Sequence, residues 1–213
     1  MASKKKSEDT VVVPPVNKTP RIAIAGAGGI GAYFAQFLFD YGAVRNQLHF
    51  PVGEVVIFDD DTVDVSNLLH QNFTEDDLGK SKADIVAAKC FMKAEKRFMT
   101  EKDFPDYDVV FSCVDSMKFR KQLYEYSWKH PELYWVDGRC SSRNVGVFNS
   151  RLSEATLKKF VTDDEERRGC LLAVDKANKV SHATPIVVAS TMLQVYLNHL
   201  RGEDTLTPVT LVI

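Results

Sequence analysis

The chain has 213 residues, of which 45% are hydrophobic, so it is long enough for one well-buried α/β core and short for two domains. Its 27 basic and 29 acidic residues give a formal net charge of -2, so no overall field draws it to nucleic acid or to an anionic membrane. No apolar run approaches the length of a membrane span, and no apolar segment follows the lysines at 4–6 as in a secretory signal. We therefore expect a cytoplasmic protein with neither nucleic acid nor membrane among its partners.

The N-terminal part of the chain predicts a tail followed by a strand, a helix and a second strand. Residues 1–19 show no helical or strand periodicity, which predicts a flexible tail. The run 22–25 predicts a buried parallel strand, and Ile30 to Tyr41 predicts the helix after it. A long connection over 43–53 leads to a second strand at Val55 to Phe58.

The rest of the chain continues the alternation of strands and helices. A polar loop is expected over residues 73–80, and a helix over 81–96. Later strands are expected at 108–114, 133–136 and 145–148, and Asp137-Gly138 separates the second of these from the third. Helices are expected at 116–129 and at 184–200, and Gly202 closes the second helix. This order predicts an α/β fold of one domain over 20–213, a Rossmann-like doubly wound, mainly parallel sheet with helices on both faces.

A glycine-rich turn, G-A-G-G-I-G, joins the first strand to the first helix. It contains Gly26, Gly28, Gly29 and Gly31. Glycines at this point let the backbone approach an anion, whose charge is stabilised by amide groups and by the helix dipole. Tight strand-to-helix packing around another ligand, or around none, is the alternative. The pattern favours nucleotide binding.

Polar residues follow the second strand in a way that a dehydrogenase does not require. Asp59 ends that strand, where a carboxylate can accept both ribose hydroxyls, and a solvated acidic turn with Asp60 and Asp61 is the alternative. The segment then continues with Asn67, His70, Gln71 and Lys82. Cationic and polar groups that converge on the phosphate end suit a nucleotide whose phosphates react, rather than one whose nicotinamide does.

Two further charged residues are candidates for a ligand site. Lys82 lies early in a predicted helix, where the dipole disfavours a cation unless a phosphate or carboxylate holds it; a solvated surface lysine is the alternative. Asp115 follows a strand and precedes a helix, so it lies at the carboxyl edge of the sheet, where ligands of open α/β folds bind. A capping aspartate is the alternative there, but Ser116 can cap instead and leave Asp115 for a metal.

These motifs together resemble the ThiF/MoeB family, the adenylating domain of ubiquitin-activating enzymes. The resemblance is carried by the glycine turn, D-x-D at 59–61, S-N-L at 66–68, G-x-x-K ending at Lys82, S-C-V-D at 112–115 and A-T-P at 183–185, and it spans most of the chain after residue 20. It implies ATP-dependent adenylation of the free C-terminal carboxylate of a small ubiquitin-like or sulfur-carrier protein or peptide, with release of pyrophosphate. It also implies ATP and Mg²⁺ as cofactors, and a homodimer.

The resemblance assigns roles to individual residues. It implies that Asp59 holds the ribose, with Asp61 as a second candidate, and that Asp115 helps hold magnesium. Asn67 and Lys82 would contact the nucleotide phosphates. The candidate catalytic set is Asn67, His70, Lys82 and Asp115, and the candidate cofactor-binding set is Gly26, Gly28, Gly29, Gly31, Asp59, Asp61, Asn67 and Lys82.

The sequence departs from the family at several points. His70 stands where the family has arginine, and an imidazole is mostly neutral at pH 7 unless an anion raises its pKa. The family also borrows an arginine from an N-terminal helix of the partner subunit, and residues 1–20 predict no such helix. Arg139 and Arg143 are candidates to compensate, and a surface role is equally compatible with their position.

The four cysteines bear on metal and thioester chemistry. Cys90, Cys113, Cys140 and Cys170 form no C-x-x-C pair, so no zinc is expected. Some relatives pass the acyl group to a cysteine, for which Cys140 and Cys170 are the candidates here, and buried or incidental thiols are the alternative.

Two other functions are compatible with the sequence. One is a catalytically weakened nucleotide-binding scaffold or partner subunit of the same fold, which the histidine at position 70 favours. The other is an NAD(P)-dependent oxidoreductase, which is supported by the glycine motif and Asp59 alone and gives no role to Asn67, Lys82 or Asp115.

Overall fold

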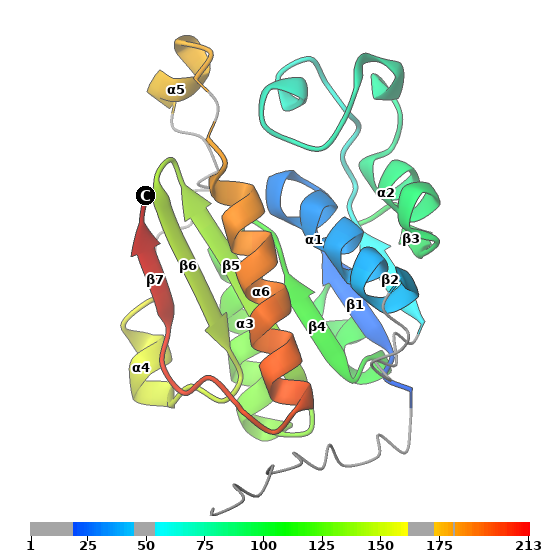
Figure 1. Cartoon of the computed structure of the whole chain (residues 1–213). Helices are drawn as coiled ribbons and strands as arrows, with labels where there is room; N and C mark the ends of the chain where they lie inside the picture. The colour runs from blue at the N-terminus through cyan, green and yellow to red at the C-terminus, as the bar shows by residue number, and fades with distance from the viewer. Residues whose placement is uncertain (1–18, 45–53, 162–172, 181) are drawn as a thin grey trace, which may run out of the picture.

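The computed structural model describes residues 19–44, 54–161, 173–180 and 182–213 (Figure 1). In these residues seven strands form one sheet in the order β3-β2-β1-β4-β5-β6-β7. The strands are β1 (Ile22–Ala25), β2 (Val55–Phe58), β3 (Lys93–Glu95), β4 (Val109–Ser112), β5 (Tyr134–Ser141), β6 (Asn144–Asn149) and β7 (Val209–Val212). Most of the expected tail, and residues 45–53 of the expected long connection, lie outside the described residues.

The sheet is parallel over its first five strands and antiparallel at one edge. β1 lies between β2 and β4 and pairs with both in parallel, so that Ile22 is level with Val55 on one side and with Val109 on the other. β6 and β7 close the far edge by antiparallel pairing. The strand order therefore reverses at β1, which is the point where open α/β sheets leave a crevice for ligands. The predicted doubly wound, mainly parallel fold is confirmed.

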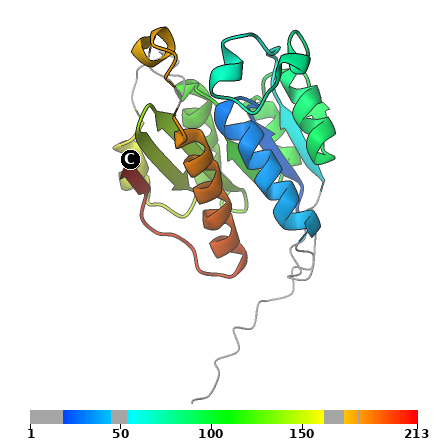
Figure 2. The same ribbon diagram turned by 45° about the horizontal axis from the view of Figure 1, so that its top comes forward.

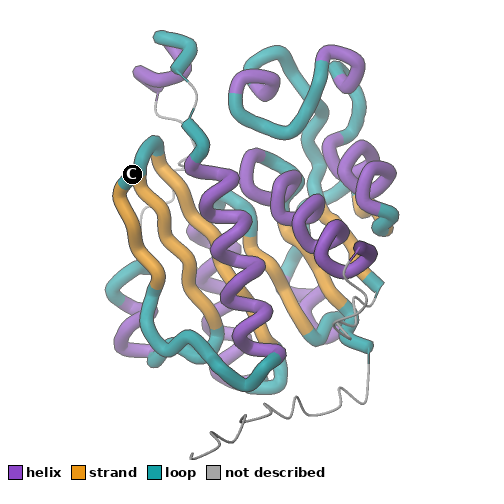
Figure 3. The backbone as a smooth tube through the Cα atoms, viewed as in Figure 1, coloured by secondary structure: helices purple, strands orange, loops and turns teal. Residues whose placement is uncertain are grey.

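Helices cover both faces of this sheet, as the tube and the tilted view show (Figures 2 and 3). They are α1 (Gly29–Phe39), α2 (Lys82–Cys90), α3 (Met117–Lys129), α4 (Glu154–Lys158), α5 (Ala173–Ala177) and α6 (Thr184–Leu200). Shorter turns of helix are η1 (Asp40–Val44), η3 (Asn67–Leu69), η4 (Glu75–Asp77) and η5 (Glu101–Asp106). None of the described helices is long and apolar enough to cross a membrane.

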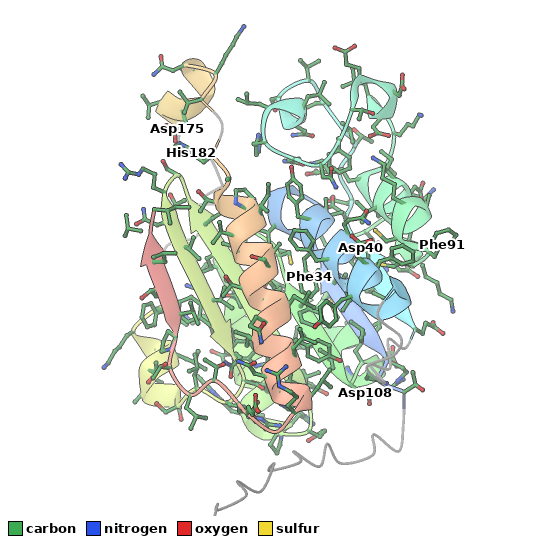
Figure 4. The ribbon with its side chains drawn as sticks, in the orientation of Figure 1. Phe34, Asp40, Phe91, Asp108, Asp175 and His182 are labelled. Atoms are coloured by element: carbon green, nitrogen blue, oxygen red, sulfur yellow. The ribbon has the colours of Figure 1, made fainter. Side chains whose placement is uncertain are left out.

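Two hydrophobic clusters, one on each face, make up the core. Successive strand residues point to opposite faces, so Ile22 and Ile24 join α1, α2 and α6 in one cluster, while Ala23 and Ala25 join α3 and α4 in the other. In Figure 4 the labelled Phe34 side chain extends from α1, and its ring centroid lies 4.3 Å from that of Phe111 in β4. Both faces of β1, β2 and β4 are thus buried, which explains their continuous apolar sequence.

The structure corrects two predicted elements. The helix expected over 81–96 ends at Cys90, because Phe91 takes a left-handed conformation with φ of 54° and the chain turns into the edge strand β3. β3 is short and mostly exposed, so it carries no hydrophobic signal. β5 runs through Asp137-Gly138 without interruption, since the fully buried Asp137 carboxylate finds polar partners inside the core.

Candidate functional site

A cavity of about 830 Å³ lies at the carboxyl ends of β1, β2 and β4. Residues from the turn after β1, the segment after β2 and the loop after β4 form its walls. Of the residues predicted for a site, those lining this cavity are Gly26, Gly28, Gly29, Asp59, Asp61, Asn67, His70, Lys82 and Asp115. Gly31 is the predicted site residue that does not line it. The tertiary structure therefore brings predicted site residues from position 26 to position 115 together around one space.

The glycines of the turn serve two different purposes. A Cβ at Gly31 would lie 1.9 Å from the carbonyl oxygen of Gly26, so Gly31 is needed for the close packing of helix against turn. A Cβ at Gly28 would meet nothing nearer than the Gln71 side chain at 3.9 Å, so Gly28 borders open space. The first turn of α1 has no side-chain cap, which leaves its N–H groups available to an anion in the cavity.

Asp59 fastens the glycine turn to the end of β2. Its Oδ2 accepts a hydrogen bond from the N–H of Ala27 at 2.6 Å, and its Oδ1 accepts one from the N–H of Asp61 at 2.9 Å. Burial raises the pKa of Asp59, although these backbone bonds and the charge of Lys82 oppose that shift. The carboxylate is thus already a structural acceptor, and its contact with a ribose stays a prediction.

Lys82 is buried and forms an ion pair with Asp61. Its Nζ lies 3.0 Å from Oδ2 of Asp61, and the lysine side chain is 7% exposed while the aspartate is 63% exposed. Ser81 caps α2 by accepting a hydrogen bond from the N–H of Asp84. A lysine in the first turn of a helix thus has a carboxylate to offset the dipole, and it is not a solvated surface residue.

The segment after β2 presents amide groups to the cavity. Asn67 is buried and its Oδ1 accepts a hydrogen bond from the N–H of Asp64 at 3.0 Å, which fixes the orientation of its side-chain amide. Gln71 Nε2 lies 3.4 Å from His70 Nε2, and Gln71 Oε1 is buried without a hydrogen-bond partner among the described residues. This oxygen lies close to Gly28 on the cavity wall and is an acceptor without a partner among the described residues.

Asp115 lines the cavity, and its carboxylate does not cap the helix that follows. Ser116, not Asp115, caps α3, because its Oγ accepts a hydrogen bond from the N–H of Phe119 at 3.3 Å. Within the described residues, neither a hydrogen bond nor an ion pair engages the Asp115 carboxylate. A half-buried, unpaired carboxylate in the same cavity as the glycine turn fits the oxygen ligands that Mg²⁺ prefers.

A second group of carboxylates follows β2. Oxygens of Asp59, Asp60 and Asp61 lie within 4.8 Å of one another. Asp59 already accepts two backbone hydrogen bonds and Asp61 already pairs with Lys82, so their partners within the protein account for this cluster.

Sequence reasoning missed several residues of the cavity wall. Besides the predicted residues, the wall includes Phe98, Met99, Thr100, Lys118, Arg120 and Gln122. Arg120 had a signal in the sequence, because it falls on the apolar stripe of α3 beside Phe119 and Leu123, and an arginine at such a position requires a buried partner. The segment 98–100 had none, since it follows a strand too short to recognise.

Two arginines and two cysteines are further candidates from the sequence. Arg139 does not line the cavity; it is directed to Asp137 and to the carbonyl oxygen of Phe160 at 2.7 Å. Arg143 lies at the β5–β6 turn and donates to the carbonyl oxygen of Ile213. Cys140 is buried and lines the cavity, and Cys170 lies outside the described residues.

The fold and the cavity define a Rossmann-like domain with a glycine-rich turn beside a cavity at the reversal point of its sheet. The sequence matches the ThiF family over residues 16–211, and the chain belongs to this family. The predicted membership is thereby confirmed.

Relatives in other organisms match parts of the chain. It is 24% identical over 156 residues to ubiquitin-like modifier-activating enzyme 5 of Drosophila grimshawi, covering 62% of this chain and 34% of that protein. It is 33% identical over 112 residues to the adenylyltransferase and sulfurtransferase UBA4 of Lodderomyces elongisporus, covering 46% and 22%. It is 42% identical over 69 residues to the SAMP-activating enzyme E1 of Haloferax volcanii, covering 32% and 22%. The matched segments therefore span between 22% and 34% of these relatives' length.

Solved structures share the fold. E. coli MccB with succinimide superposes with a TM-score of 0.65 at 12% identity, covering 91% of this chain and 60% of that one. E. coli MccB with ATP gives a TM-score of 0.62 at 12% identity, covering 91% and 63%. At such low identity the likeness establishes the arrangement of strands and helices alone.

Proposed function

We propose that this chain catalyses the ATP-dependent adenylation of the C-terminal carboxylate of a small ubiquitin-like or sulfur-carrier protein or peptide. The observation that carries the proposal is the composition of one cavity. It is lined by the uncapped first turn of α1, by the side chains of Asn67 and Lys82, and by the Asp115 carboxylate, which has no partner among the described residues. The names of the relatives, an adenylyltransferase and sulfurtransferase, a ubiquitin-like modifier-activating enzyme and a SAMP-activating enzyme, support the same chemistry.

The proposed reaction requires positioning and charge neutralisation rather than a covalent nucleophile. An oxygen of the carboxylate attacks the α-phosphorus of ATP, the bond from that phosphorus to the α,β-bridging oxygen breaks, and the electron pair leaves with pyrophosphate. The products are an acyl-adenylate and pyrophosphate, and no proton needs to move. Donors already fixed in place stabilise the charge that develops on phosphate oxygens.

Each residue then has a part in that reaction. The N–H groups at the start of α1 and the Asn67 amide would donate to phosphate oxygens, and Lys82 would turn from Asp61 to the same anion. Mg²⁺ bound at Asp115 would supply further positive charge to the phosphates. In the same proposal Asp59, with Asp61 as second candidate, holds the ribose.

A second candidate, a nucleotide-binding scaffold or partner subunit with little or no turnover, is favoured by one observation. His70 occupies the cavity at the point where the resemblance implies an arginine, so one permanent cation is replaced by a titratable imidazole. We further propose a homodimer in the cytoplasm. An NAD(P)-dependent oxidoreductase has no such observation in its favour.

The first experiment measures thermal unfolding with MgATP, AMP, NAD and NADP in parallel, for the natural chain and for Asp115→Ala. A ligand at about 100 times its dissociation constant adds roughly 2.7 kcal/mol to the free energy of unfolding, which moves the midpoint by a few degrees. Selective stabilisation by MgATP that weakens in Asp115→Ala supports the proposal. Stabilisation by NAD alone contradicts it.

Binding alone does not separate the enzyme from the scaffold. Pyrophosphate exchange into ATP, measured with candidate carrier proteins and with the same carriers lacking their last residue, makes that distinction. Exchange that requires the intact C-terminus identifies the enzyme, and MgATP binding without exchange for any carrier favours the scaffold.

A further inference from the structure

A buried carboxylate behind the cavity wall anchors two arginines. Asp137 of β5 is fully buried and accepts hydrogen bonds from four side chains. Ser112 Oγ and Arg120 Nε donate to Oδ1 at 2.7 and 2.9 Å, and Tyr124 Oη and Arg139 Nε donate to Oδ2, each at 2.7 Å. Burial by itself would raise the pKa of Asp137, but the two guanidinium charges and these bonds outweigh it and lower the pKa. Asp137 is therefore a charged anchor for both arginines.

Arg120 connects this anchor to the loop that carries Asp115. The side chain is 8% exposed and lines the cavity. While its Nε is held by Asp137, its Nη2 donates to the carbonyl oxygen of Val114 at 2.5 Å. That carbonyl belongs to the peptide group whose nitrogen is Asp115, so one guanidinium fixes the peptide plane directly before the aspartate. The cap made by Ser116 fixes the other side.

Arg139 shares the anchor but not the loop. Its Nη1 donates to the carbonyl oxygen of Phe160, its Nη2 donates to Tyr124 Oη at 2.6 Å, and its guanidinium lies 4.5 Å from the centre of the Phe148 ring. The two arginines thus make the same kind of bond to the same carboxylate, and of the pair Arg120 alone contacts the loop at 113–116.

We propose that Arg120 is a positioning residue, which holds the Asp115 carboxylate in the orientation required for a metal-bound nucleotide. The planar guanidinium fork can reach Asp137 and the Val114 carbonyl together, whereas the single ammonium of a lysine cannot keep both bonds in the same geometry. Groups that orient a metal ligand without touching the metal commonly change metal affinity when they are removed. The inference rests on the proposed function, because it takes Asp115 as a ligand of the metal.

The test compares Arg120→Lys with the matched control Arg139→Lys. For each variant, calorimetry gives the dissociation constant of ATP in EDTA and that of MgATP, and their ratio reports how much the metal contributes to binding. We expect Arg120→Lys to lower this ratio about tenfold, as loss of an orienting partner does. Arg139→Lys should keep the ratio of the natural chain, although it removes a bond to the same buried carboxylate. Thermal midpoints show that each variant is folded at the assay temperature, and Arg120→Gln replaces Arg120→Lys if the latter does not fold.

A double variant distinguishes positioning from a separate structural effect. If Arg120 acts through Asp115, adding Arg120→Lys to Asp115→Ala should leave the ratio of Asp115→Ala unchanged. The inference is overturned if Arg120→Lys keeps the natural ratio, if Arg139→Lys lowers it equally, or if the two changes add. If ATP binding by the natural chain does not depend on the metal, the proposed function is overturned as well. If the natural chain and Asp115→Ala behave as proposed but Arg120→Lys has no effect on the ratio, this inference alone is overturned.

Discussion

The ammonium group of Lys82 lies 3.0 Å from the Asp61 carboxylate, with the lysine buried and the aspartate largely exposed. Without a nucleotide, Asp61 therefore supplies the negative charge that the first turn of α2 requires beside a lysine. A phosphate that enters the cavity would compete with Asp61 for the same ammonium group. This competition gives the pair a testable consequence.

Asp61→Asn should destabilise the ligand-free chain and enlarge its response to MgATP. The loss should be about 1 kcal/mol, because the exposed carboxylate is well screened by water. Since the freed lysine then has no competing partner, the rise in thermal midpoint on adding MgATP should exceed that of the natural chain. A smaller rise would instead indicate that Asp61 itself contacts the nucleotide.

Gly28→Ala and Gly31→Ala should separate ligand binding from folding. At Gly28 an added methyl group projects toward the cavity with nothing within 3.9 Å, so the midpoint without ligand should stay nearly unchanged while MgATP binding is lost. At Gly31 the methyl group would lie 1.9 Å from a backbone oxygen, so the chain should be strongly destabilised or fail to fold. Retention of MgATP binding by a folded Gly28→Ala chain would contradict the assignment of the phosphate site.

His70→Arg tests whether the site is weakened or inactive. A guanidinium is charged at every relevant pH and presents five N–H donors in a fixed fork, whereas an imidazole presents at most about two. In a chain that adenylates its substrate weakly, the variant should raise the rate of pyrophosphate exchange about tenfold, the worth of one charged hydrogen bond. An unchanged absence of exchange, with MgATP still bound, would favour the scaffold.

Asp103 gives a prediction for the dependence of stability on pH. Its carboxylate receives Arg97 Nη2 and Nη1 at 2.8 and 3.0 Å, and this bonding lowers the pKa of Asp103 to about 2. A carboxyl whose pKa is lower in the folded chain than in the unfolded chain stabilises the fold above about pH 4, and that stabilisation is lost as pH falls toward 2.

Asp103→Asn should therefore lower the thermal midpoint at pH 6, and the difference from the natural chain should shrink as pH falls from about 4 to 2. Asp106→Asn, at an exposed position of the same helix η5, provides the control for the change of charge. A constant difference across that pH range would show that the Arg97 bond does not act through the ionisation of Asp103.

The strands and helices that the sequence predicted well are those with strong local patterns. The apolar runs of β1, β2 and β4, and the long helices α3 and α6, are continuous and bounded by recognisable caps or glycines. β3 and β7 escaped prediction because they are short edge strands with exposed side chains, and pairing with a neighbouring strand defines them.

For the candidate site, the sequence determined which residues are present and at which sheet edge they lie. The glycine turn, Asp59 and Asp115 each follow a strand, and the carboxyl ends of parallel strands meet at one edge, so their convergence follows from the order of elements. The sequence did not show that Gly28 borders the cavity whereas Gly31 permits close packing, because both glycines belong to the same motif.

Tertiary structure alone decided which charges are already paired. The contacts of Lys82 with Asp61, and of Arg120 with both Asp137 and Val114, join elements that local sequence patterns leave unrelated. Sequence spacing specifies which residues share a helix face or follow a strand. Ion pairs inside a fold depend on how helices pack against the sheet, and that packing is a property of the whole chain.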